Sequence, residues 1–121
     1  MIVDDDNEFR RLVGMTVKSQ DYELFFAQDG VEALKTARRE LPDVMVCDVM
    51  MPSLDGIELT RLLKADERTR NIHIILLTAS SDSEDIERGM LAGASDYFVK
   101  PFSPLDLLDR IYAVLAEKGG K

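Results

Sequence analysis

The stretch from Val44 to Gly56 constrains the fold of this chain more than any other part of its sequence. It opens with four apolar residues in succession, which is typical of a strand buried on both faces of a parallel sheet. The run stops at Asp48 and then turns through Pro52 and Asp55, next to Gly56. Because open α/β sheets bind ligands at the carboxyl ends of their strands, Asp48 is a candidate nucleophile. An aspartate that only caps the next loop is the alternative, and this stretch alone does not decide between the two.

The spacing of apolar residues predicts strands and helices in alternation along the chain. The expected strands cover residues 1–3, 23–27, 44–47, 72–77 and 97–99. The expected helices cover about 7–20, 31–40 and 83–91, with another between Gly56 and Asn71 and a last one that begins at Pro104 after the N-cap Ser103. Strict alternation with short connections predicts a parallel sheet covered by helices on both faces.

Apolar residues at helical spacing also predict which sides of two helices are buried. The predicted face of the helix at 31–40 carries Val31, Leu34 and Ala37. The predicted face of the last helix carries Leu105, Leu108, Ile111, Tyr112 and Leu115. Gly93 follows the helix at 83–91 and is expected to end it in the left-handed conformation.

Length and composition limit the classes of protein to which this chain can belong. With 121 residues and 45% apolar content, the chain is expected to form one domain with a sizeable core. It has no apolar run of transmembrane length and no signal-peptide pattern, so a soluble, cytoplasmic module is expected. A formal charge of −8 argues against nucleic-acid binding by this module itself. The single cysteine, Cys47, excludes an internal disulfide and a cysteine-built metal site.

Polar residues stand where four of the five expected strands end. Asp4 and Asp5 follow the first strand, Asp48 ends the third, Thr78 the fourth and Lys100 the fifth. Because the carboxyl ends of parallel strands share one edge of the sheet, these side chains are expected to meet. Crowded carboxylates repel one another unless a cation joins them, and oxygen ligands of this kind suit Mg²⁺.

Each of these residues also has a simpler interpretation. The aspartates at 4–6 could form a solvated cluster, Thr78 could be a core hydroxyl bonded to backbone, and Lys100 could make a surface ion pair of little energetic value. The convergence of all of them at strand ends is what favours a site. His73, the only histidine, stands at the start of a strand and is given no role.

The motifs along the chain together resemble the receiver domain of two-component response regulators over essentially its whole length, 1–121. They are Val3-Asp4-Asp5-Asp6, Asp48-Val49-Met50-Met51-Pro52 with Asp55-Gly56, Leu77-Thr78-Ala79, and Asp96-Tyr97-Phe98-Val99-Lys100-Pro101-Phe102. The resemblance implies a flavodoxin-like, doubly wound (βα)₅ fold with a five-stranded parallel sheet in the order 2-1-3-4-5.

The resemblance also implies a chemistry. Asp5, Asp48 and the backbone carbonyl of Met50 would bind Mg²⁺ directly, and Asp4 would bind it through water. Asp48 would take a phosphoryl group from a sensor histidine kinase or a phosphotransfer protein, assisted by Lys100 and Thr78. The module would promote only its own phosphorylation and dephosphorylation, so it would not be an enzyme in the ordinary sense.

A switch is implied as well. Thr78 and Tyr97 would couple the phosphoryl group to the surface formed by the helix at 83–91, the fifth strand and the last helix, which would control an output domain or partner. No direct contact of this module with nucleic acid or membrane is implied, and the expected state is a monomer or a weak, phosphorylation-dependent dimer. Of the charges that the transcription-factor branch uses to dimerise, only Asp96 and Arg110 are present as a plausible pair.

Two other classes remain alternatives. A phosphatase with an aspartyl-phosphate intermediate usually carries a second aspartate two positions after the nucleophile, where this chain has Met50. A flavin-binding carrier needs a hydroxyl-rich phosphate loop after the first strand, which is missing. The kinase, the input signal, the output and the extent of the whole protein do not follow from the sequence.

Overall fold

The computed structural model describes residues 1–3, 25–51, 53–79 and 82–119. The strands in this part of the chain are β1 (Ile2–Val3), β2 (Phe26–Ala27), β3 (Val44–Asp48), β4 (His73–Thr78) and β5 (Asp96–Val99). The helices are α2 (Gly30–Glu40), α3 (Gly56–Ala65), α4 (Ser83–Ala92) and α5 (Pro104–Gly119). The helix predicted at 7–20 and the first two residues of the strand predicted at 23–27 lie outside the described residues.

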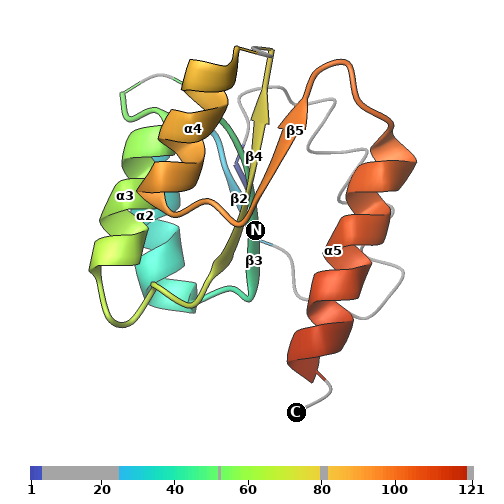
Figure 1. Cartoon of the computed structure of the whole chain (residues 1–121). Coiled ribbons are helices and arrows are strands. Elements are labelled where there is room, and N and C mark those ends of the chain that lie inside the picture. The colour runs from blue at the N-terminus through green and yellow to red at the C-terminus, as the bar shows by residue number, and fades with distance from the viewer. Residues whose placement is uncertain (4–24, 52, 80–81, 120–121) are drawn as a thin grey trace.

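The five strands form one parallel sheet in the order β2-β1-β3-β4-β5, as predicted. Helices α2, α3 and α4 lie on one face of the sheet, and α5 lies on the other (Figure 1). Strand β3 is buried along its whole length, and its residues alternate between two cores. Met45 and Cys47 face the core under α2 and α3, whereas Val44 and Val46 face the core under α5. The interpretation of this stretch as a strand covered on both faces is confirmed.

The predicted buried faces of two helices are partly wrong. Val31 is 44% exposed, whereas the predicted Ala37 is buried, together with Ala33 and Thr36. Leu105 is 71% exposed, and the buried residues of α5 are Leu107, Leu108, Ile111 and Val114. Apolar residues occupy neighbouring stripes of α5, so periodicity alone does not choose between them. Packing against β3 and β4 makes that choice.

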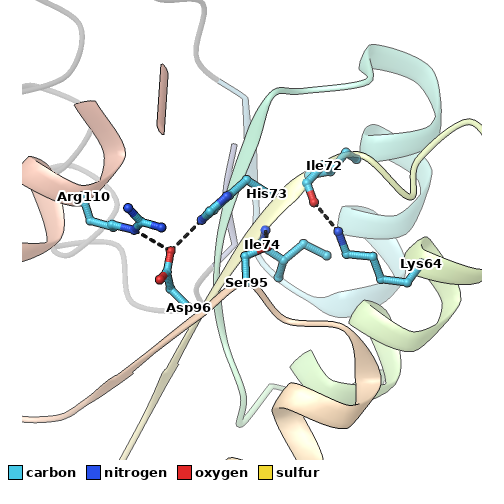
Figure 2. Close-up of polar contacts among 7 residues, drawn as sticks. All are labelled: Lys64, Ile72, His73, Ile74, Ser95, Asp96 and Arg110. Atoms are coloured by element: carbon cyan, nitrogen blue, oxygen red, sulfur yellow. Dashed lines mark hydrogen bonds and ion pairs between the residues drawn. The ribbon is translucent and has the colours of Figure 1, made fainter. Parts of the chain in front are cut away.

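Helix α3 ends at Ala65, six residues before the predicted break at Asn71. The Thr69 hydroxyl donates to the carbonyl of Leu63 at 2.6 Å, so it replaces a main-chain donor of a continuing helix. The Lys64 ammonium donates to the carbonyls of Arg70 (2.9 Å) and Ile72 (2.5 Å), the second of which is drawn in Figure 2. These side chains stabilise a compact turn that leads into β4.

Two Asp-Gly pairs begin the helices that flank the carboxyl edge of β3. The Asp29 carboxylate accepts from the amide of Glu32 at 2.9 Å, and that of Asp55 accepts from the amide of Glu58 at 2.8 Å. Each aspartate therefore caps a helix whose first residue is a glycine. At the other ends, Gly93 terminates α4 with φ of 112°, as predicted, and Leu41 terminates α2 with φ of 50°.

Candidate functional site

Three of the predicted site residues lie at adjacent strand ends. Asp48 ends β3, Thr78 ends the neighbouring β4, and Lys100 directly follows β5. Asp48 and Thr78 are buried, at 8% and 3% exposure. The amide of Lys100 donates to the carbonyl of Thr78 at 2.6 Å, which places the start of the lysine side chain beside the end of β4.

The Asp48 carboxylate has a described contact on each oxygen. The Lys100 ammonium donates to Oδ2 at 3.1 Å, across 52 positions of sequence. The amide of Met50 donates to Oδ1 at 3.3 Å, the long end of the usual range. The Lys100 side chain is 39% exposed, so the pair lies at the rim of the protein rather than in its core. The arrangement is a nearly buried carboxylate with one cation and one amide directed at it.

The loop after Asp48 is fastened close to the strand. The amide of Val49 donates to the carbonyl of Leu77 at 2.9 Å, and the amide of Gly56 donates to the carbonyl of Val49 at 2.9 Å. Ser53 has a φ of 67°, in the left-handed region that glycine favours. The side chain of Met50 is 74% exposed, although its backbone contacts Asp48.

The proposed metal ligands are only partly described. Asp4 and Asp5 lie outside the described residues, and no group of three or more histidine, cysteine or acidic side chains able to hold a metal occurs within them. The Asp48 carboxylate fits a hard cation by its chemistry, because each oxygen keeps a lone pair beyond its one described contact. The Mg²⁺ site stays a prediction.

Tyr97, the second predicted switch residue, is on β5, and its ring lies next to Gly89 of α4. A Cβ atom built on Gly89 of α4 would come within 3.1 Å of both the Tyr97 ring and Leu76. The Tyr97 hydroxyl is buried and has no hydrogen-bond partner within the described structure. Gly89 is also the one residue of α4 that is buried. The ring therefore occupies space that a larger residue at 89 would close.

His73, for which the sequence predicts no role, belongs to a polar cluster at the opposite edge of the sheet. Its Nε2 lies 2.5 Å from Asp96 Oδ2, and Arg110 Nε donates to the same oxygen at 2.8 Å (Figure 2). The hydrogen bond to Asp96 raises the pKa of Arg110. Asp96 and Arg110 thus pair within one chain. The signal in the sequence was that His73 stands near the start of the fourth predicted strand and Asp96 directly precedes the fifth.

None of the helices in the described ranges is long and apolar enough to cross a membrane.

Residues 1–112 match the response regulator receiver domain family. The phosphate regulon transcriptional regulatory protein PhoB of Pseudomonas aeruginosa is 39% identical over 98% of this chain and 52% of its own length. The alkaline phosphatase synthesis transcriptional regulatory protein PhoP of Bacillus subtilis is 39% identical over 95% of this chain and 47% of its own length. The chain therefore spans about half the length of these relatives.

Comparison with a solved structure also indicates a receiver-domain fold. The receiver domain of the Francisella response regulator 1452 is 32% identical and superposes with a TM-score of 0.87, over 97% of this chain and 95% of that one. With this likeness and the family match over 1–112, the chain belongs to the receiver domain family of two-component response regulators.

Proposed function

We propose that this module takes a phosphoryl group from a phosphohistidine onto Asp48, the donor being a sensor histidine kinase or a phosphotransfer protein. The observation that carries the proposal is the Lys100 ammonium at 3.1 Å from the carboxylate of a nearly buried strand-end aspartate. A carboxylate oxygen of Asp48 forms the new bond to phosphorus. The bond from phosphorus to the donor imidazole nitrogen breaks, and the electron pair stays on that nitrogen.

The remaining residues position the reacting groups and neutralise the charge of the phosphoryl group. Lys100 offsets the charge of the phosphoryl oxygens, and the Thr78 hydroxyl supplies a hydrogen bond to one of them. Asp4, Asp5, Asp48 and the Met50 carbonyl are the groups that would hold Mg²⁺, which when bound neutralises charge on the transferring group. The chain's own part is to hold the carboxylate in line with the donor, through the Met50 amide and Lys100.

The output side of the proposal concerns Thr78 and Tyr97. A phosphoryl group on Asp48 draws Thr78 toward it, and Tyr97 moves in response, which changes the surface of α4, β5 and α5. That surface then controls an output domain or a partner protein. Relatives of about twice the length are transcriptional regulators, which supports a cytoplasmic role upstream of gene expression without contact between this acidic module and DNA.

The module catalyses no turnover of an external substrate in this proposal. Its only reactions are its own phosphorylation and the loss of the phosphoryl group to water. A phosphatase would release phosphate repeatedly from a donor, whereas this module is expected to take up one phosphoryl group per chain and hold it.

Labelling with a small phosphodonor tests the nucleophile. With acetyl phosphate and Mg²⁺, the native protein should take up one hydroxylamine-sensitive phosphoryl group, and Asp48→Asn should take up none while keeping its fold by circular dichroism. Asp55→Asn, which alters a capping aspartate nearby, is the matched control and should still be labelled. Labelling that persists in Asp48→Asn would place the nucleophile elsewhere.

The switch needs its own test. NMR spectra of free protein and of protein carrying beryllofluoride should show shifts that spread from Asp48 to Tyr97 and α4. In Thr78→Ala, beryllofluoride should still bind but the shifts should stay near Asp48. Equal spread in both proteins would mean that the signal bypasses Thr78.

A further inference from the structure

Helix α2 approaches the loop after Asp48 at one unusually close point. A Cβ atom built on Gly30 would lie 2.0 Å from the carbonyl oxygen of Leu54 and 2.5 Å from the Leu54 Cβ. Both distances are far below any real carbon contact, and the nearest atom belongs to backbone that cannot rotate away. Residue 30 therefore has to be glycine for the loop to lie where it does.

Backbone conformation does not explain this glycine. Gly30 begins α2, and among the described glycines only Gly93 has a positive φ. The first position of a helix accepts most side chains, and the Asp29 cap already satisfies the helix start. What residue 30 must provide is space for Leu54, whose side chain is partly buried against the core under α2 and α3.

The described residues of the loop between Asp48 and Leu54 have little freedom to absorb a displacement. Gly56 and Val49 are joined by a hydrogen bond of 2.9 Å, and Ser53 already has a left-handed φ. A Cβ atom on Gly56 would lie 2.6 Å from the Asp48 carbonyl oxygen, so this end of the loop is also closely packed. Met50 precedes Leu54 by four positions, and its 3.3 Å hydrogen bond to Asp48 is the contact most easily lost.

We propose that Gly30 is a positioning residue for the phosphoacceptor. By leaving room for the Leu54 carbonyl, it lets α2 support the loop that holds the Met50 amide on Asp48 Oδ1. The inference rests on the proposed function, because it assigns Gly30 an effect on phosphoryl transfer to Asp48. Misplacement of a reacting group by a fraction of an ångström is enough to slow such a step.

The test compares Gly30→Ala with Val31→Ala, a change at the next position of α2 where the side chain is 44% exposed. Gly30→Ala should lower the rate constant of phosphorylation at saturating acetyl phosphate and Mg²⁺ by about tenfold or more, with the half-saturating donor concentration unchanged. In the free, metal-free protein it should shift the amide resonances of Met50 and Leu54. Val31→Ala should change neither the rate constant nor these resonances.

A second variant loosens the same loop without changing the contact between Gly30 and the backbone and Cβ of residue 54. Leu54→Ala keeps Gly30 but removes the side chain that holds the loop against the core, and it introduces no clash. It should shift the Met50 amide and slow phosphorylation in the same direction, so the inference can be tested even if Gly30→Ala does not fold.

The outcomes separate the two proposals. Folded Gly30→Ala protein with the native rate constant and an unmoved Met50 amide overturns the role of Gly30, even if its melting temperature falls. If Gly30→Ala does not fold, a native rate constant and Met50 resonance in Leu54→Ala would show that the position of the loop does not control the Met50 amide, and this result also overturns the role of Gly30. If native protein takes up no phosphoryl group on Asp48, the proposed function fails instead, while the metal-free Met50 resonance still reports whether Gly30 supports the loop.

Discussion

Met50 presents two different groups to the same site. Its amide donates a hydrogen bond to Asp48, whereas the residue as a whole is 74% exposed to solvent. An apolar side chain in this place cannot orient a water molecule for attack on an aspartyl phosphate. The phosphorylated form is therefore expected to decay slowly.

Met50→Asn should shorten the lifetime of the phosphorylated protein. One hydrogen bond that orients the attacking water, contributing about 1.4 kcal/mol in the transition state, corresponds to roughly tenfold in rate. Decay of a radiolabelled phosphoryl group after removal of the donor measures this lifetime. Met90→Asn makes the same chemical change at an exposed position on α4 and should leave it unaltered. A longer lifetime in Met50→Asn would refute the explanation.

At the scale of the elements, α2 and α4 end in the same backbone conformation but with different residues. Both helices end in the left-handed conformation, α4 with Gly93 and α2 with Leu41. A side chain in that conformation costs roughly 1 kcal/mol, which glycine avoids. Leu41 is 48% exposed, so it recovers little of this cost by packing.

Leu41→Gly should therefore raise the free energy of unfolding, by up to about 1 kcal/mol after the extra entropy of glycine in the unfolded chain is counted. The reciprocal change, Gly93→Ala, should lower it, because its φ is 112° and a Cβ atom would also lie 2.6 Å from the Lys64 side chain. Urea denaturation of the three proteins measures both effects. A loss of stability in Leu41→Gly would mean that the leucine packs more favourably than its exposure indicates.

Within the part of the chain that the structure describes, the sequence predicted which elements exist, but their ends and faces less well. Strand β3 was predictable because a run of apolar residues ends at a charged one. The end of α3 was not, because it depends on the Thr69 hydroxyl and the Lys64 ammonium reaching carbonyls up to eight positions away. The placement of Asp48 and Lys100 at strand ends was predictable because it follows from local sequence. The close approach of Gly30 to Leu54 was not, because it arises only when separate elements pack together.

For the whole molecule, the formal charge is −8, so the free energy of unfolding depends on how closely its carboxylates lie to one another. Asp48 is nearly buried, and its one described cation is a partly exposed lysine, so this ion pair contributes little. Repulsion between Asp48 and the acidic residues that follow β1 is expected to destabilise the protein when no divalent cation is present.

Asp48→Asn should raise the melting temperature in metal-free buffer and reduce the stabilisation given by added Mg²⁺. The difference in free energy of unfolding should be of order 1 kcal/mol, because the site is partly open to solvent. Asp109→Asn, which removes the same charge from an exposed position on α5, is the control and should leave the response to Mg²⁺ unchanged. If native protein melts at one temperature with and without Mg²⁺, the metal site is not there.

The buried, unpartnered hydroxyl of Tyr97 has an optical consequence. The chain contains no tryptophan and three tyrosines, so its near-ultraviolet spectrum is free of indole. With Tyr22 and Tyr112 replaced by phenylalanine, Tyr97 becomes the only phenol, and its absorption band reports directly whether the hydroxyl meets water or apolar carbon. A spectrophotometer can then follow the state of the ring in real time, without a label, as a phosphodonor is added.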